Sequence, residues 1–154
     1  MHSLSPVRSF DFVAHHPAAL SFLVAEDDDE LRFVIVYLLQ EAFPQAAVAA
    51  YPNGRDALRD FDARGATLVV SNHSMPVMNG PTFVHQLRRR SSSLPILMVS
   101  GSPEARQEGR AAGISCFLDK SELHSSLVAA VRSLLEDPAA CCTDLPGVAQ
   151  RSDR

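Results

Sequence analysis

Residues 22–42 read FLVAEDDDELRFVIVYLLQEA: a short apolar run, an acidic turn and then a helical pattern. The first four residues are continuously apolar, which is typical of a strand buried on both faces of a sheet. From Leu31 onward, apolar residues recur at i, i+3, i+4, i+7, i+8 and i+11, which is one face of an α-helix. Pro44 then ends the helix, because proline lacks an N–H and clashes with the preceding turn. The stretch therefore predicts a strand followed by a helix.

The same alternation continues to about residue 137. The expected strands are residues 22–25, 46–51, 68–70, 96–99 and 114–118, and the expected helices are residues 31–42, 54–64, about 81–90, 103–112 and 121–136. Asn53-Gly54 is expected to open a helix, Ser102 and Ser121 to cap helices, and Gly113 to follow one. Apolar strands that alternate with helices indicate an α/β domain with a parallel sheet covered on both faces. We expect a flavodoxin-like, doubly wound (βα)5 sheet with strand order 2-1-3-4-5.

Length and composition are those of one globular domain. The 154 residues are 46% hydrophobic and 21% charged, with a net charge of −4. We expect the domain at residues 20–137, an N-terminal tail at 1–19 and a disordered C-terminal tail at 138–154. Basic and acidic residues are mixed along the chain, so nucleic-acid binding is not expected. No apolar run is long enough to span a membrane and no signal peptide is evident, so we expect a cytoplasmic protein without membrane contact.

Polar residues gather where the expected strands end. In doubly wound sheets, ligands bind beyond the carboxyl ends of the strands. The residues at these ends are Glu26-Asp27, Asn72, the run Met75-Pro76-Val77-Met78-Asn79-Gly80, Ser100-Gly101 and Lys120. They bring two carboxylates, an amide, a hydroxyl and an ammonium to one edge of the sheet.

These motifs, in this order and spacing, resemble the receiver domain of two-component response regulators over residues 20–137. In that family an acidic pair and an aspartate bind Mg²⁺, and the aspartate accepts phosphate from a histidine kinase. The resemblance implies that Glu26, Asp27 and the backbone carbonyl of Ser74 are the metal ligands. It also implies that the phosphoryl-contact and switch positions are Ser100, Gly101, Lys120 and Phe117.

The phosphoacceptor position lies three residues before the Met-Pro pair, and Asn72 occupies it. A carboxamide is not a nucleophile, so Asn72 cannot form the acyl phosphate. It also removes one negative charge from the cation site, so we expect Mg²⁺ to bind weakly. Lys120 is expected to donate a hydrogen bond to Asn72. Two further departures are Asn79, where the family usually has aspartate, and Ser121, where it commonly has proline.

We therefore expect a stand-alone, non-enzymatic receiver-like domain of a phosphorelay system that acts through protein contacts without phosphorylation. The partner would be a histidine kinase or another signalling protein, and a homodimer stays open. The expected interface is formed by the helix 103–112, the strand 114–118 and the last helix. Its residues are Ala105, Arg106, Phe117, Leu118 and Asp119.

Two alternatives remain open from the sequence alone. The chain could be an ordinary phosphoaccepting response regulator captured as an Asp→Asn mutant, which codon 72 of the encoding gene would decide. It could instead be a small flavodoxin-like hydrolase with Asp27 as the nucleophile. Turnover of an aryl phosphate would distinguish such an enzyme from a signalling module.

Overall fold

Strands and helices alternate along residues 19–139, the part of the chain that this computed structural model describes. The strands are β1 (Ser21–Ala25), β2 (Ala47–Tyr51), β3 (Leu68–Asn72), β4 (Ile96–Ser100) and β5 (Cys116–Asp119). The helices are α1 (Asp29–Ala42), α2 (Gly54–Arg64), α3 (Gly80–Arg90), α4 (Pro103–Ala112) and α5 (Leu123–Glu136), with a 3-10 helix, η1 (Lys120–Glu122), before α5. The predicted tails, residues 1–19 and 138–154, lie outside the described residues except at 19, 138 and 139.

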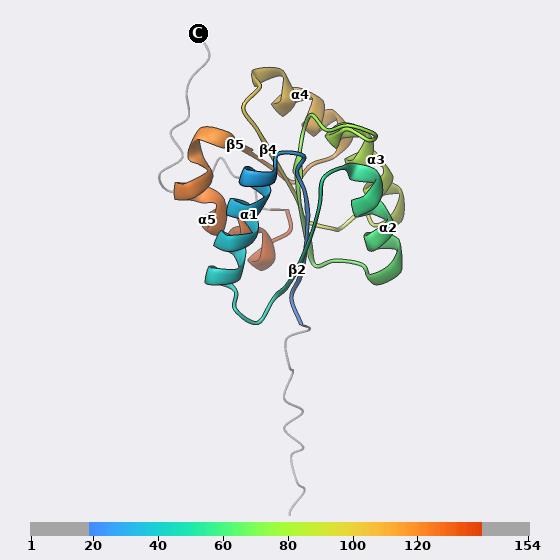
Figure 1. Ribbon diagram of the computed structural model, residues 1–154. Helices are drawn as coiled ribbons and strands as arrows, with labels where there is room; N and C mark the ends of the chain where they lie inside the picture. The colour runs from blue at the N-terminus through green and yellow to red at the C-terminus, as the bar shows by residue number, and fades with distance from the viewer. Residues whose placement is uncertain (1–18, 140–154) are drawn as a thin grey trace, which may run out of the picture.

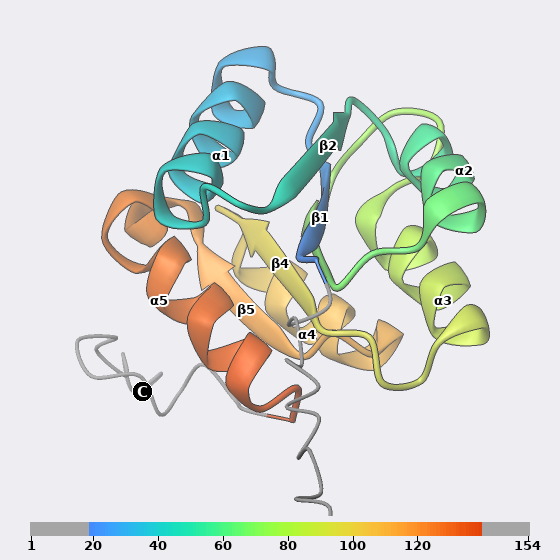
Figure 2. The same cartoon turned by 90° about the horizontal axis from the view of Figure 1, so that it is seen from below.

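The five strands form one parallel sheet in the order β2-β1-β3-β4-β5, which confirms the predicted topology. Figure 1 looks onto the β2 edge of this sheet, and Figure 2 shows the strands in succession from β2 to β5. Helices α1 and α5 cover one face, and α2, α3 and α4 cover the other. The sheet is therefore the middle layer of three.

Two apolar cores lie on the two faces of the sheet. Successive strand side chains point to opposite faces, so Phe22 and Val24 join the core under α1 and α5, whereas Leu23 and Ala25 join the core under α2 and α3. Within residues 19–139, no helix is long and apolar enough to cross a membrane.

The start of β5 differs from the prediction. The strand begins at Cys116 instead of residue 114. Gly113 adopts a left-handed conformation at the end of α4, with a φ of 108°, and the N–H of Ile114 bonds back to the carbonyl of Gly109 at 3.1 Å. Ile114 is thus part of the helix cap and cannot join the sheet, because its N–H is already used.

The predicted cap of the last helix is also wrong. Helix α5 begins at Leu123, since residues 120–122 form the 3-10 turn. Asp119 caps this turn by accepting from the N–H and the hydroxyl of Ser121, at 2.9 and 2.7 Å. Ser102 does precede α4, but its hydroxyl donates to Glu104 at 2.7 Å and does not cap the helix.

Candidate functional site

The carboxyl ends of β1, β3, β4 and β5 meet at one edge of the sheet, the upper edge in Figure 1. The strand register places Ala25 beside Ser71 and Ser100 beside Asp119. The predicted site residues follow or end these strands: Glu26, Asp27, Asn72, Ser74, Ser100, Gly101 and Lys120. The topology thus brings them to the same edge, as parallel strands require.

Glu26 is a buried carboxylate at the end of β1. Its side chain is 1% exposed, and burial raises its pKa from 4.5 to about 7, against the opposing effects of the Asp28 N–H and the Lys120 ammonium. Its Oε1 atom accepts from the Asp28 N–H at 3.2 Å, whereas its buried Oε2 has no hydrogen-bond partner among the described residues. Arg32 holds the backbone here by donating to the Glu26 carbonyl at 2.8 Å.

Asn72 lies at the centre of the site and is 5% exposed. Its Nδ2 group donates to three oxygen atoms: Ser74 O at 2.8 Å, Asp27 Oδ1 at 3.0 Å and Glu26 Oε1 at 3.3 Å. These are the three groups that the resemblance assigned as metal ligands. The amide nitrogen therefore points at the atoms on which a cation would depend.

The orientation of the amide follows from its partners. Asn72 Oδ1 accepts from the backbone N–H of His73 at 2.8 Å. That N–H can only donate, and a backbone carbonyl such as Ser74 O can only accept. Turning the amide over would place the oxygen against Ser74 O and the Asp27 carboxylate, and the nitrogen against an N–H. The donor end must consequently face the acidic pair.

This arrangement does not fit a resident Mg²⁺. Mg²⁺ needs near-octahedral oxygen ligands at about 2.0–2.1 Å, and a donor NH₂ group already occupies the point toward which the three oxygens converge. No cluster of three or more His, Cys, Asp or Glu side chains that could hold a metal occurs in residues 19–139. The Oε2 atom of Glu26, which has no hydrogen-bond partner among the described residues, would favour a cation, but burial also raises the pKa of this carboxyl to about 7, which lowers its negative charge.

Lys120 and Ser100 flank this centre. The Lys120 ammonium lies 3.8 Å from Glu26 Oε1, so it pairs with the buried carboxylate and not, as expected, with Asn72. Ser100 is 5% exposed, and its hydroxyl accepts from the Ser102 N–H at 3.1 Å. Gly101 is exposed and leaves open space, since an added Cβ would come no closer than 4.0 Å to the Lys120 side chain.

Phe117 lies within β5, is partly buried, and packs against the core on the face of the sheet that α2, α3 and α4 cover. The guanidinium of Arg106 lies 5.1 Å from the centre of its ring. Two residues of the expected interface cannot contact a partner, because Ala105 and Leu118 are buried at 0% and 2% exposure. The sequence pattern placed them on the surface because it did not show which side of α4 packs on the sheet. It also did not show which side chains of β5 the helices cover.

The loop after β3 is held tightly against the end of this strand. The N–H of Gly80 bonds to the carbonyl of His73 at 2.7 Å, and a Cβ at position 80 would lie 2.2 Å from the Asn72 carbonyl. Only glycine allows this approach. Val77, farther out in the loop, has a positive φ of 69° and is 66% exposed.

Besides the Lys120–Glu26 pair, the sequence analysis missed the contacts of His73. His73 Nε2 lies 2.6 Å from Glu108 Oε2, which ties the loop after β3 to α4, and His73 Nδ1 lies 3.1 Å from the Ser74 hydroxyl. His73 and Glu108 are 35 residues apart in the sequence, and no motif indicates that their side chains are in contact.

Comparison with known proteins decides the family. The response regulator receiver domain matches residues 22–132, well over half of the chain. The chain belongs to the response regulator receiver family. The fold and the placement of the strand-end residues in this receiver domain agree with that membership.

The relatives of this receiver domain are regulatory proteins. It is 32% identical over 117 residues to the sensory transduction protein RegX3 of Mycobacterium bovis, covering 75% of this chain and 50% of that protein. It is 34% identical over 128 residues to SphR of Synechococcus elongatus, an alkaline phosphatase synthesis transcriptional regulatory protein, covering 76% and 49%. The chain thus spans about half the length of these curated relatives.

Solved structures of other proteins also resemble this receiver domain. The chemotaxis protein CheY4 of Vibrio cholerae is 30% identical with a TM-score of 0.64, and the match covers 77% of this chain and 98% of that one. The receiver domain of the Francisella response regulator 1452 has a TM-score of 0.68 at 24% identity, covering 76% and 97%, and supports the fold alone.

Proposed function

We propose that this receiver domain signals through protein contacts without being phosphorylated. The observation that carries the proposal is the Asn72 amide, whose nitrogen donates to Glu26, Asp27 and Ser74. Formation of an acyl phosphate needs a carboxylate oxygen that attacks phosphorus. At this position the chain offers a neutral amide instead, and its oxygen is engaged by the His73 N–H.

The amide also performs a structural role that a cation would otherwise fill. Oxygen atoms that converge without a counter-charge repel one another, and the two N–H groups of Asn72 supply partial positive charge among them. The site is therefore assembled without metal. Mg²⁺ binds weakly, because it must displace the amide and break these hydrogen bonds.

The partner, in this proposal, is a histidine kinase or another signalling protein of a phosphorelay system. It contacts the face formed by α4, β5 and α5, where Arg106 is exposed and Phe117 and Asp119 are half-buried. The domain limits of 20–137, a cytoplasmic location and the lack of enzymatic activity belong to the same proposal. Because RegX3 and SphR are named as sensory transduction and transcriptional regulatory proteins, a hydrolase that uses Asp27 is not the function that we propose.

The alternative that Asn72 is an introduced Asp→Asn substitution predicts the same chemistry for this chain, but a natural protein that carries aspartate and accepts phosphate. If the natural residue were aspartate, the encoding gene would carry an aspartate codon at position 72. Reading that codon separates a natural asparagine from an introduced one.

The experiment that tests the proposal uses a small phosphodonor. The purified chain is incubated with acetyl phosphate and Mg²⁺, and its intact mass is measured before and after hydroxylamine treatment. We expect no gain of phosphate, whereas the matched Asn72→Asp variant, which has a carboxylate nucleophile beside the same Ser100 and Lys120, should gain one hydroxylamine-labile phosphate. A labile phosphate on the parent chain would show that another residue accepts it and would refute the proposal.

A further inference from the structure

Strand β2 is an outer edge of the sheet, and within residues 19–139 its short length is its main protection against pairing. It pairs with β1 on one side only, and its sequence, AVAAY, contains no charged residue and no proline. The N–H of Ala47 and the carbonyl of Tyr51 bond toward β1, so the alternate residues Val48 and Ala50 direct their N–H and C=O groups outward. Edges of this kind are templates for pairing with another strand, unless charge, proline or a covering element blocks them.

Helix α1 presents an apolar surface beside this edge. Phe33 and Tyr37 are 71% and 52% exposed, and their rings stack with centroids 6.4 Å apart and planes 16° apart. The helix is apolar at every position from Leu31 to Leu39 except Arg32. A helix that is apolar around its whole circumference is normally covered on all sides.

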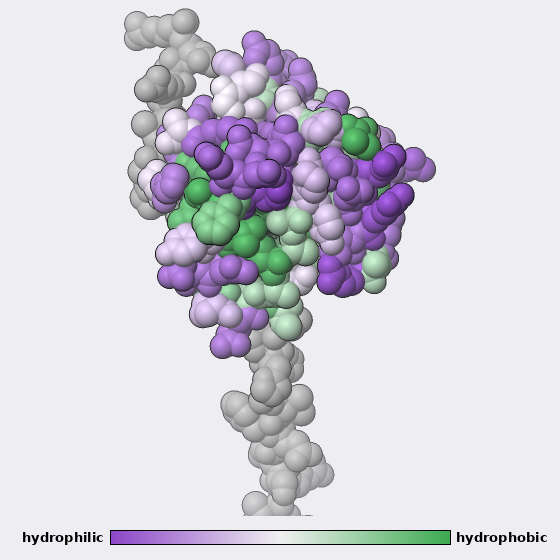
Figure 3. Space-filling model, in the orientation of Figure 1, coloured by the Kyte–Doolittle hydropathy of each residue, from purple (hydrophilic) through white to green (hydrophobic). Residues whose placement is uncertain are grey.

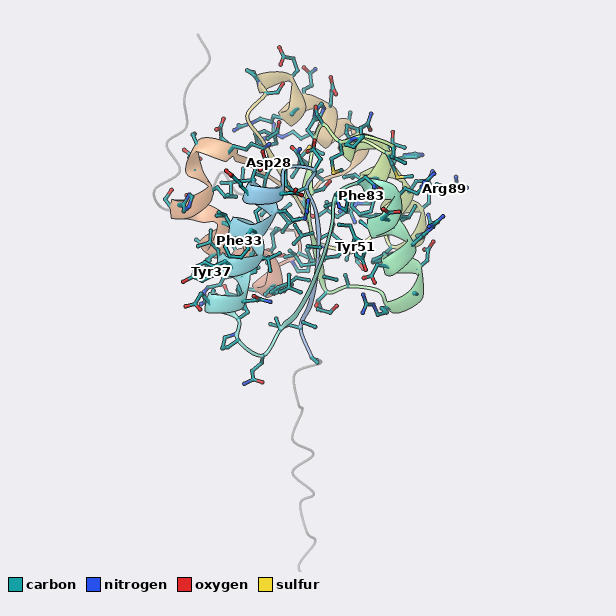
Figure 4. All side chains as sticks on the ribbon, in the orientation of Figure 1. Asp28, Phe33, Tyr37, Tyr51, Phe83 and Arg89 are labelled. Carbon is teal, nitrogen blue, oxygen red and sulfur yellow. The ribbon has the colours of Figure 1, made fainter. Side chains whose placement is uncertain are left out.

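The exposed edge of β2 and the apolar surface of α1 lie on the same side of the molecule. Figure 4 shows Phe33 and Tyr37 along α1 in the view that looks onto β2. In the same orientation, Figure 3 shows a green apolar area over α1 and β2 between purple areas above and below. The two features form one continuous surface.

We propose that this surface, formed by β2 and by Phe33 and Tyr37 of α1, joins two copies of the chain in a symmetric dimer. A two-fold axis normal to the sheet would set β2 antiparallel to β2 of the second copy. Val48 would then exchange both backbone hydrogen bonds with Ala50 of the other copy, and Ala49 would lie opposite its own counterpart. The same rotation places the two α1 helices side by side on one face of a continuous sheet.

The second copy fits this surface better than a foreign strand does. One rotation satisfies both the strand edge and the α1 rings, whereas a single added strand would leave the rings exposed. Small side chains at Ala47, Ala49 and Ala50 allow close approach, and no like charges meet across the strand pair, since β2 carries none. The proposal does not depend on the chemistry of Asn72.

The exposed area of Phe33 and Tyr37 indicates how stable the proposed dimer should be. A buried aromatic side chain contributes about 150–250 Å², so the exposed parts of Phe33 and Tyr37 offer roughly 250 Å² per copy. Even with the five-residue strand, the interface stays below the lower limit of about 1,200 Å² for a stable complex. The dimer should accordingly be weak and depend on concentration.

The first test is the molar mass of the full chain across a concentration series, measured by sedimentation or light scattering. We expect a reversible monomer–dimer equilibrium that Phe33→Ser weakens by about tenfold or more, as loss of a central aromatic contact does. Val77→Ser is the matched control, because Val77 is 66% exposed but lies in the loop after β3. It should change the equilibrium less than about twofold. A monomer at all concentrations up to about 1 mM, the range of very weak complexes, or equal effects of the two variants would overturn the proposal.

The second test addresses the strand pairing itself. In the proposed register, the two Ala49 Cα atoms lie about 4.5 Å apart, within disulfide range, so Ala49→Cys should cross-link the two copies on mild oxidation. Ala47→Cys is the control, since its two copies would be roughly 13 Å apart along the strand. The parent chain serves as the blank for the native cysteines, and peptide mapping must place the linkage between the two substituted positions. Equal cross-linking of the two variants at these positions would contradict the register.

Discussion

Asn72 replaces a negative charge with a hydrogen-bond donor at the point where three oxygen atoms converge. Aspartate is nearly the same size but has no N–H to offer, so it would add a third acid to Glu26 and Asp27. Neighbouring carboxylates raise one another's pKa and destabilise the folded protein when no cation is present. The amide thus removes the nucleophile and, in the same step, the need for a cation.

Glu26 gives a prediction about pH. Its pKa is raised from 4.5 to about 7, mainly because burial disfavours the charged form. Between these two values the unfolded chain releases the proton of Glu26 while the folded chain keeps it. The folded state therefore binds more protons, and the free energy of unfolding should fall as the pH rises from about 4.5 to about 7.

Urea denaturation of the parent chain and of Glu26→Gln across this pH range checks the prediction. Glutamine keeps an acceptor oxygen for Asn72 and Asp28 but does not titrate. The parent should lose stability relative to the variant as the pH rises. If both proteins show the same pH dependence, Glu26 is ionised throughout this pH range. The Lys120 ammonium would then have cancelled the effect of burial on the pKa of Glu26.

The residues of the site could be named from the sequence, but their hydrogen bonds could not. Strand ends and the family motif located Glu26, Asp27, Asn72, Ser100 and Lys120 correctly at one edge. The direction of the Asn72 amide depends on the His73 N–H and on Ser74 O, whose positions are set by the fold of the loop. The Lys120–Glu26 pair was missed for a different reason: the lysine side chain is long enough to reach several acceptors, and the sequence does not show which one it contacts.

At the scale of elements, the loop between β3 and α3 stores backbone strain. Val77 has a φ of 69°, a conformation that costs a non-glycine residue about 1–3 kcal/mol. It is the central residue of a γ-turn, because the Met78 N–H bonds to the Pro76 carbonyl at 2.7 Å. The side chain is 66% exposed and so gains little from packing.

Val77→Gly should therefore stabilise the protein by about 1 kcal/mol, after the extra chain entropy of glycine is subtracted. Thermal unfolding provides the measurement. Val77→Ala is the matched control: it removes the same exposed apolar side chain but keeps a Cβ at positive φ, and should gain much less. A glycine variant that melts at or below the parent temperature would show that the turn is not strained.

Element bounds followed the sequence wherever capping residues are unambiguous. Asn53 caps α2 by accepting from the Asp56 N–H at 2.9 Å, and Gly113 ends α4 as expected. The bounds failed around β5, where Ile114 is drawn into the cap of α4 and residues 120–122 form a 3-10 turn. In both places a local hydrogen bond competes with the regular element, and apolar periodicity does not report such competition.

At the scale of the whole molecule, alternating apolar runs were sufficient to predict the three-layer architecture and the strand order. They were not sufficient to predict the outer surface of α1. The periodic positions from Leu31 to Ala42 describe the face toward the sheet, whereas Phe33 and Tyr37 lie outside that pattern and are exposed. Where side chains are apolar on every side of a helix, periodicity cannot indicate a second contact surface.

The central claim is that the Asn72 amide takes the place of a cation, and global stability with and without Mg²⁺ tests it. Asn72→Asp is nearly isosteric, so it should preserve the packing of β3 while adding a third carboxylate beside Glu26 and Asp27. Without Mg²⁺, the variant should be less stable than the parent. Because a ligand that binds only the folded state stabilises it, Mg²⁺ should restore that stability in the variant alone.

The deciding measurement is the free energy of unfolding of both proteins by urea at zero and about 10 mM Mg²⁺, a concentration that stabilises by about 1.4 kcal/mol if the dissociation constant is about 1 mM. We predict a gain of about 1 kcal/mol or more for Asn72→Asp and no measurable gain for the parent. An equal gain in the parent, or a variant that is no less stable than the parent without Mg²⁺, would contradict the account.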